Sequence, residues 1–225
     1  MQNGNGFEID LKTQFAIKKY KIVLGYNKFM GLYMNGIGIG KNPNEFNRNS
    51  TYQHYFNKIG KSKENILLIN NFMPNDVCNQ LIEIVNKINK PKDLAFWDEM
   101  MYFDKDLSEI IFPYINKIKK QIELFYDVLV KPNYRIHVNK WTVGKSLGLH
   151  VDDLSEYSTI NHIATLIYLN DNYEGGEIYF PEYNNLIKPN IGDLIIFPGN
   201  LNYVHEVKSI INGNRYTIPT WFRFA

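Results

Sequence analysis

The chain has 225 residues, of which 44% are hydrophobic and 15% aromatic, and its formal net charge at pH 7 is +2. This length and apolar content predict one large domain with a real core, and a charge so near zero gives no argument for nucleic-acid binding. The single cysteine, Cys78, excludes an intramolecular disulfide and fits a reducing compartment, while no apolar run approaches a membrane span. We therefore expect a cytoplasmic protein that does not enter a membrane.

Residues 1–60 form a predicted N-terminal extension whose role the sequence leaves open. Apolar runs at 15–24 and 29–34 are compatible with strands. The glycines of 36–40 begin like a dinucleotide-binding motif, but that fingerprint needs a glycine where Lys41 stands, so a flexible turn is the better interpretation. The extension could be an accessory arm, a partner surface or a cover on a sheet edge.

Two helical runs follow a short strand. Residues 65–70 have the pattern of a buried strand, and a helix is predicted to open at Pro74, with Asn75 as its cap and apolar residues at helical spacing. A second helical run covers 105–129. Pro113 inside it predicts a kink or a division into two helices.

From residue 134 onward the pattern becomes that of strands separated by Gly, Pro and Asn turn signals. The predicted strands cover 135–141, 160–169, 177–180, 193–197, 204–208 and 216–224. Regular strand spacing without intervening helices favours a closed antiparallel barrel or sandwich. We therefore expect a mainly β fold with flanking helices. Its main domain spans 61–225, with helical support over about 75–130 and the β core over about 134–225.

A set of polar residues in the β-rich half has the spacing of a metal site. His150 and Asp152 stand two apart, so on an extended segment their side chains leave the same face. His205, flanked by apolar residues, is the candidate second imidazole, and two His with one carboxylate are the ligand set of non-haem Fe(II) oxygenases. Arg215, ten residues later, can hold a carboxylate by a bidentate pair. Each feature alone is common in structural roles, but their ordered combination is restrictive.

Residues from about 65 to the C-terminus resemble the 2-oxoglutarate- and Fe(II)-dependent dioxygenases, in particular the prolyl 4-hydroxylase branch. Beyond the four residues above, the resemblance lies in segments that occur in the order and spacing of that family. These segments are Trp141–Gly144, Ala164–Asn170, Tyr173–Glu177, Lys188–Phe197 and His205–Trp221.

The resemblance implies a double-stranded β-helix, or jelly roll, with Fe(II) held by His150, Asp152 and His205. It further implies that 2-oxoglutarate binds with its far carboxylate on Arg215, and that O2 is the third reactant, with ascorbate as a candidate reductant. A protein or peptide would be hydroxylated while 2-oxoglutarate is converted to succinate and CO2. The family uses Lys or Arg at the carboxylate-binding position, so Arg215 leaves the substrate undecided.

Four aromatic or apolar positions around the expected site follow from the same resemblance. Tyr168 matches a tyrosine that contacts the far carboxylate, with a core tyrosine as the alternative, and Trp221 would pack near the cosubstrate. Trp141 stands where the family usually has Tyr, and an indole N–H can donate but not accept. Leu147 replaces a second common Tyr, on the substrate side. Both departures weaken the case for a standard prolyl substrate.

Other polar residues near these motifs are given structural roles. His137 and His162 are expected to be packing residues, with a minor chance that His162 supports the site. Asp153 and Glu156 make the approach acidic, and we expect them to be solvated loop residues.

The favoured function is hydroxylation of protein or peptide proline, with protein lysyl hydroxylation as the nearest alternative. Demethylation of nucleic acid is less favoured, since that family repeats Arg six residues after the first and this chain has Trp221 there. A non-catalytic jelly-roll binding module is disfavoured because no predicted ligand is missing.

Overall fold

The computed structural model describes residues 54–91, 94–133, 135–154 and 161–225. Its larger sheet contains β1 (Leu67–Ile69), β2 (Met101–Tyr102), β3 (Val130–Asn133), β4 (Val138–Trp141), β6 (Ile163–Tyr168), β10 (Leu194–Pro198) and β13 (Arg215–Phe224). The smaller sheet contains β5 (Leu147–His150), β8 (Ile178–Phe180), β9 (Asn185–Ile187) and β11 (His205–Val207), and a separate pair is formed by β7 (Glu174–Gly175) and β12 (Ile210–Asn212). The helices are α4 (Asn75–Lys87), α5 (Phe96–Met100) and α6 (Lys105–Tyr126), with 3-10 turns η1 (Lys63–Asn65), η2 (Asp152–Leu154), η3 (Pro181–Tyr183) and η4 (Leu201–Tyr203).

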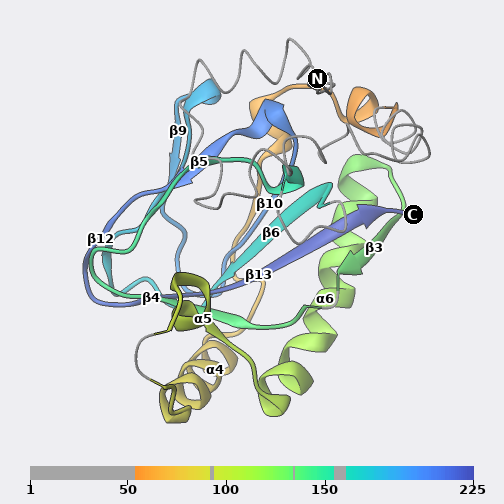
Figure 1. Cartoon of the computed structure of the whole chain (residues 1–225). Helices are drawn as coiled ribbons and strands as arrows, with labels where there is room; N and C mark the ends of the chain where they lie inside the picture. The colour runs from red at the N-terminus through yellow and green to blue at the C-terminus, as the bar shows by residue number, and fades with distance from the viewer. Residues whose placement is uncertain (1–53, 92–93, 134, 155–160) are drawn as a thin grey trace, which may run out of the picture.

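The two sheets face each other, and α4 and α6 lie against the outer side of the larger one (Figure 1). The larger sheet runs β1-β10-β6-β13-β4-β2 with β3 also paired to β13, and the smaller runs β5-β11-β8-β9. Their described pairings are antiparallel. The prediction of a mainly β fold with flanking helices and a jelly-roll core is therefore confirmed.

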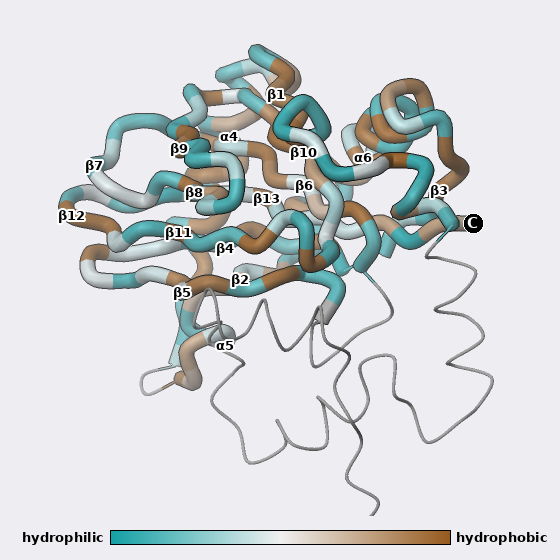
Figure 2. The backbone as a smooth tube through the Cα atoms, turned by 90° about the horizontal axis from the view of Figure 1, so that it is seen from above, coloured by the Kyte–Doolittle hydropathy of each residue, from teal (hydrophilic) through white to brown (hydrophobic). Residues whose placement is uncertain are grey.

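Strand alternation divides the core into two layers. Along β6 and β10, Ile163, Ile167 and Ile196 face the helices, while Tyr168 and Phe197 face the smaller sheet. Much of the backbone of β6, β10 and β13 carries hydrophobic residues, as Figure 2 shows. The long strand β13 therefore directs every second side chain toward the space between the two sheets, where a site can form.

Pro219 lies near the middle of β13, where a residue without an N–H would normally weaken a sheet. The strand pairs with β4 up to Thr217 and with β3 from Trp221 onward. Pro219 falls between these two pairings and is opposite a residue of β6 only. The sheet therefore accommodates this proline in a stretch of β13 where the edge toward β3 and β4 has no pairing.

The helical layer differs from the sequence expectations at two points. Asn75 is the first residue of α4 and makes no capping hydrogen bond, because the chain enters the helix through Pro74. The run at 105–129 is one helix, α6, ending at Tyr126 with Pro113 inside it, so the division into two helices was wrong. Five apolar side chains bind α6 to the sheet, and each contributes about 1.5–3 kcal/mol when fully buried. They are Leu107, Ile111, Ile115, Ile118 and Ile122.

Only the end of the predicted N-terminal extension belongs to the described part of the chain. Residues 54–59 are helical, and Phe56 packs edge-on against Phe224 at the end of β13. The segment continues into a contact with Tyr203, whose hydroxyl donates to the backbone carbonyls of Gly60 and Ser62. The division at residue 60 remains a prediction, and the two strands expected before residue 35 lie outside the described residues.

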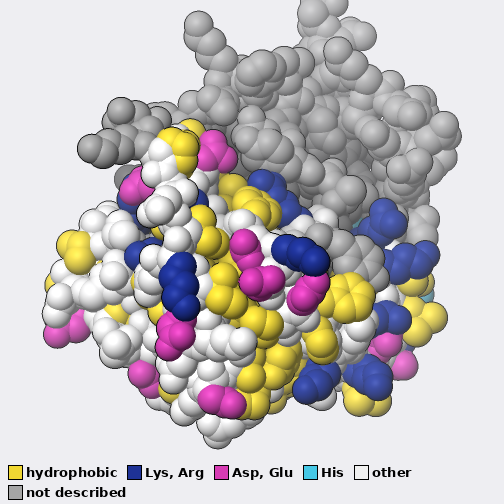
Figure 3. Space-filling model, turned by 90° about the horizontal axis from the view of Figure 1, so that it is seen from below, with side chains coloured by type: hydrophobic (Ala, Val, Ile, Leu, Met, Phe, Trp, Pro, Cys, Tyr) yellow, Lys and Arg dark blue, Asp and Glu magenta, His cyan; other side chains and the backbone are white. Residues whose placement is uncertain are grey.

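The described residues include no helix with the length and apolar character needed to cross a membrane. On the underside of the molecule, acidic and basic side chains are interspersed around apolar ones (Figure 3). A groove between α4 and α6 on the helical layer carries both signs, with Glu83, Lys87, Asp106 and Glu109 among its lining residues.

His162 gives the fold a pH dependence. Burial, followed by the positive charge of Arg223, lowers its pKa to about 3, and its ring stacks on Phe224 while Nδ1 accepts from the Phe224 N–H. A folded-state pKa below the unfolded value means that the unfolded chain binds the proton first, so stability falls as pH drops below about 6.5.

Lowering the pH from 7 to 5 should therefore cost about 2 kcal/mol of unfolding free energy through His162 alone. Urea denaturation of the metal-free protein at both pH values measures this cost. In a His162→Gln variant the amide oxygen can still accept from Phe224, so the fold should survive and this share of the pH dependence should vanish. An unchanged pH dependence in the variant would contradict the assignment to His162.

Candidate functional site

Two strands of the smaller sheet bring the predicted histidines together. His150 ends β5 and His205 begins β11, and these two residues are direct partners in the antiparallel pairing. Their ring centroids lie 4.1 Å apart with 53° between the ring planes. A separation of fifty-five residues in sequence is thus closed by a single cross-strand pair.

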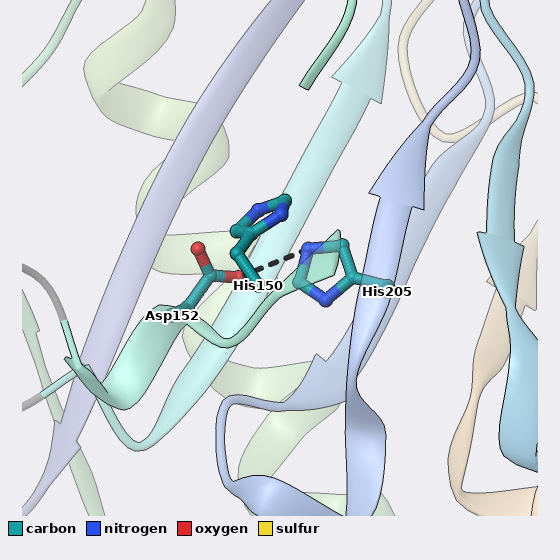
Figure 4. Close-up of side chains that lie close together, drawn as sticks. All are labelled: His150, Asp152 and His205. Atoms are coloured by element: carbon teal, nitrogen blue, oxygen red, sulfur yellow. Dashed lines mark ion pairs between the residues drawn. The ribbon is translucent and has the colours of Figure 1, made fainter. Parts of the chain in front are cut away.

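Asp152 completes the group, but by a different local geometry from the one predicted. The extended segment ends at His150, and Asp152 starts the 3-10 turn η2. This turn places the Asp152 carboxylate beside His205, with 3.6 Å between Asp152 Oδ2 and His205 Nε2 (Figure 4). One ligand atom from each of the three residues lies within 4.8 Å of the others, which is the spacing of a metal site.

Backbone carbonyls orient both imidazole rings. His150 Nδ1 lies 2.7 Å from the Gly148 carbonyl oxygen, and His205 Nδ1 lies 3.1 Å from that of Tyr203. A carbonyl can only accept, so each Nδ1 carries the proton and donates it. The lone pair of each ring then resides on Nε2. This arrangement is the usual way in which proteins prepare histidine for a metal.

The electrostatics of the group favour a cation over an empty site. Burial, and then His150, lower the pKa of His205 well below its usual value, so His205 is neutral and able to act as a ligand. Burial raises the pKa of Asp152, while His150 and a hydrogen bond from the Trp221 side chain oppose this rise. A divalent cation bound here would offset the desolvation cost of the buried ionised carboxylate.

Trp221 thus has a more specific role than the packing expected from the sequence. Its indole N–H is a donor to Asp152, and such support of a ligand is commonly worth 10–100-fold in metal affinity. Trp221→Phe should therefore weaken Mn(II) or Fe(II) binding by about tenfold in a metal titration. Trp97→Phe, at a half-exposed tryptophan of α5, is the matched control. Equal metal affinity in the two variants would show that the indole N–H does not support Asp152.

Arg215 lies on the inward face of β13, the same face as Trp221. It is 1% exposed, and its Nη2 donates to the Tyr168 hydroxyl over 3.1 Å. Within the described residues, no carboxylate forms an ion pair with this guanidinium. A buried cation without a protein counter-charge is costly, which points to an anionic ligand.

Aromatic residues enclose Arg215. The guanidinium carbon lies 4.9 Å from the ring centroid of Tyr168 and 5.5 Å from that of Trp141, its cross-strand partner on β4. Trp141 Nε1 and Arg215 Nε are buried without a hydrogen-bond partner among the described residues, and the buried Tyr173 hydroxyl has Arg215 beside it but no acceptor for its own proton. Such unpaired buried donors are rare and suit a site that receives an acceptor from a ligand.

Tyr173 was missed as a functional candidate in the sequence, although it belongs to the Tyr173–Glu177 motif. The glycine at 176 explains its position, because φ there is +69° and a Cβ would lie 3.0 Å from Arg215 Cδ and 3.2 Å from Tyr173 Cε2. The turn therefore needs glycine both for its backbone conformation and for the approach of Arg215.

Two histidines outside the metal group can be compared with their expected roles. His162 faces the helical layer with Phe224, so the minor alternative of a supporting role at the site was wrong. His137 is buried between Phe103 and Trp221, as a packing residue should be.

Asp153 is not solvated as expected, because its Oδ1 is buried without a partner among the described residues. Burial, followed by the charge of Asp152, raises its pKa well above the usual value. Glu156 lies outside the described residues.

The substrate-side expectation concerns Leu147. Leu147 packs against the apolar cluster that contains Trp141, rather than standing alone at the mouth of the site. The short helix α5 lies over the same cluster, with Phe96 edge-on to Trp141 at 6.3 Å. Apolar side chains from β5 and α5 therefore pack on Trp141, the cross-strand partner of Arg215.

Known proteins are similar to the part of the chain that contains these residues. Residues 136–223 match the family model of the 2OG-Fe(II) oxygenase superfamily. Prolyl 3-hydroxylase 2 of Rattus norvegicus is 35% identical over 69 residues, covering 28% of this chain and 10% of the relative. The chain thus spans about a tenth of the length of the prolyl 3-hydroxylases that it matches.

Two solved structures share the fold. The viral collagen prolyl hydroxylase vCPH from Paramecium Bursaria Chlorella virus-1, solved as its 2OG complex, has a TM-score of 0.58 at 17% identity and covers 72% of this chain and 97% of its own. A prolyl hydroxylase from Trichoplax adhaerens, in complex with a hypoxia inducible factor oxygen degradation domain peptide fragment, has a TM-score of 0.52 at 16% identity, with 82% and 94% covered.

The matched region contains every site residue described above, from Trp141 on β4 to Trp221 on β13. Two oriented imidazoles and a carboxylate fit a divalent iron, and the unpaired Arg215 fits a dicarboxylate. Residues 136–223 thus match the 2OG-Fe(II) oxygenase superfamily in sequence, and the side chains of the site lie within that stretch.

Proposed function

We propose that this protein is a 2-oxoglutarate- and Fe(II)-dependent dioxygenase that hydroxylates proline residues of a protein or peptide. One observation carries the proposal. A group of two imidazoles and one carboxylate with ligand spacing occurs in the same inter-sheet space as a buried arginine that has no carboxylate partner. The first feature suits the metal and the second suits the far end of a dicarboxylic cosubstrate.

His150 Nε2, His205 Nε2 and an Asp152 carboxylate oxygen would hold the metal, since both Nδ1 atoms are occupied by carbonyl acceptors. Three protein ligands leave positions open for cosubstrate and O2. Bound Fe(II) with 2-oxoglutarate supplies oxidising chemistry that couples cosubstrate decarboxylation to hydroxylation of a C–H bond.

The protein contributes position and shelter. Arg215 and Tyr168 would fix the far carboxylate, and their complete burial keeps water from competing for it. Phe180 and Phe197 pack against His205, with ring centroids 5.4 and 4.7 Å away, and give the ligand an apolar surround. These contacts hold the imidazole in place while the open positions exchange their occupants.

Proline is favoured as the target because the curated relatives in this comparison include prolyl hydroxylases, and one structural neighbour was solved with a peptide bound. None of the relatives described above is named a lysyl hydroxylase, so the lysyl alternative gains no support. The net charge of +2 and the mixed signs on the underside give no support for a nucleic-acid substrate.

The test is hydroxylation of proline-containing peptides by the full chain with Fe(II), 2-oxoglutarate and ascorbate. Mass spectrometry should show a gain of one oxygen atom on proline, with fragmentation reporting the position on the ring, and an equal amount of succinate. Peptides in which the proline is replaced by alanine are the control. Oxygen gained on lysine instead, or on nucleic-acid bases offered in parallel, would overturn the substrate assignment while leaving the iron chemistry intact.

A further inference from the structure

Donors outnumber acceptors around Arg215. The guanidinium has only N–H groups, and its Nη2 already donates to the Tyr168 hydroxyl. Arg215 Nε and Trp141 Nε1 are buried and have no hydrogen-bond partner among the described residues, and the buried Tyr173 hydroxyl has Arg215 beside it as a donor but no acceptor for its own proton. These side chains come from β13, β4 and the turn before β7, so three separate segments supply donors to one place.

Tyr173 is held firmly in this group. It is 3% exposed and packs in the apolar cluster with Trp141, Val207 and Ile210. Its backbone carbonyl accepts from Lys188 Nζ over 2.7 Å. Its ring edge and Arg215 Cδ both lie close to the position of a Cβ on Gly176, at 3.2 and 3.0 Å, so the two side chains are neighbours.

A tyrosine hydroxyl beside a guanidinium can donate one hydrogen bond. Its oxygen can accept from the guanidinium, and its own O–H then needs an acceptor. Tyr168 is in this position already, and Tyr173 is the second phenol next to the same cation. Burial raises the pKa of Tyr173 above its usual value, so its hydroxyl keeps the proton. The charge of Glu177 adds to this rise, but among the described residues no carboxylate accepts a hydrogen bond from the Tyr173 hydroxyl.

We propose that Tyr173 is a specificity-determining residue. Its hydroxyl, the Tyr168 hydroxyl and the Arg215 guanidinium would form a pocket that offers only hydrogen-bond donors to a bound ionised carboxylate. The inference rests on the proposed function and names how the cosubstrate is selected. A carboxylate has only acceptors and can satisfy these donors together. The carboxamide of the same shape brings two N–H donors that would face other donors, so 2-oxoglutaramate should be rejected.

The experiment measures binding to the full chain loaded with Mn(II), so that no turnover occurs. Calorimetry gives the Kd of 2-oxoglutarate, and displacement of 2-oxoglutarate gives the Kd of 2-oxoglutaramate. Tyr173→Phe should weaken 2-oxoglutarate binding by about tenfold, because it removes one hydrogen bond to a charged group. The preference for 2-oxoglutarate over 2-oxoglutaramate should shrink by a similar factor. Tyr114→Phe on α6, which removes a tyrosine hydroxyl from the helical layer, should change neither value.

Each outcome decides the matter. If Tyr173→Phe binds 2-oxoglutarate like the wild type, or weakens both ligands by one common factor, Tyr173 has no specific contact and the inference fails. Equal unfolding midpoints of Tyr173→Phe and the wild type exclude a folding defect as the cause of any loss. Arg215→Ala tests separately whether the proposed function holds. If wild type binds 2-oxoglutarate and this variant does not, the proposed function stands whatever Tyr173 does.

Discussion

Arg215→Ala should raise the 2-oxoglutarate concentration needed for half-maximal succinate formation by about thirtyfold or more. The guanidinium is buried at 1% exposure and has no carboxylate partner among the described residues. Its removal would leave the far carboxylate of the cosubstrate buried and unpaired, at a cost of about 2–5 kcal/mol by analogy with buried charge pairs at interfaces. Each 1.4 kcal/mol corresponds to about tenfold in affinity.

The effect should be confined to the cosubstrate. Metal affinity should barely change, since Arg215 is not among the three clustered ligands. Arg215→Lys should be milder, because an ammonium can still reach the carboxylate although it loses the planar fork. Arg223→Ala removes an exposed arginine from the same strand and is the matched control. Identical succinate curves for wild type and Arg215→Ala would show that the cosubstrate is held elsewhere.

His205→Ala should abolish metal-dependent turnover and lower the affinity for Fe(II) by more than about 100-fold, since loss of a ligand exceeds the loss of its supporting contacts. His205 is 3% exposed, is neutral because burial lowers its pKa, and is aimed by the Tyr203 carbonyl. The remaining His150 and Asp152 cannot enclose one side of an octahedral ion.

A metal titration by fluorescence or calorimetry, with succinate formation measured in parallel, checks this result. His54→Ala, at an exposed histidine of the helical segment 54–59, should behave as the wild type. Circular dichroism should show that His205→Ala retains its sheets, because His205 lies at the end of the short strand β11. Undiminished iron affinity in a folded His205→Ala protein would remove this histidine from the metal site.

The sequence predicted which residues form the site better than it predicted the local geometry of those residues. The order and spacing of His150, Asp152, His205 and Arg215 were sufficient to name the residues that the structure places in the space between the sheets. The spacing could not show that Asp152 leaves the strand in a 3-10 turn, because a two-residue interval fits both an extended segment and a tight turn. The pairing of His150 with His205 depends on a long-range register that local patterns do not contain.

The longer strands were visible from their apolar runs, as β6, β10 and β13 show. The strands β7, β9 and β12 have two or three residues each, too few for any periodic signal. The environment of Tyr173 was equally hidden, since its unpaired hydroxyl results from packing between a turn and β13. A tyrosine in a glycine-containing motif predicts a turn, and only the fold shows which side chain it meets.

The proposed dioxygenase activity can be followed with isotopically labelled O2 during turnover with Fe(II), 2-oxoglutarate and a proline peptide. One labelled oxygen atom should enter succinate and the other should enter the hydroxylated residue in equal amounts, and neither product should form with His205→Ala. If wild-type protein binds Fe(II) and 2-oxoglutarate but yields no labelled succinate under these conditions, the protein is not a dioxygenase of this kind.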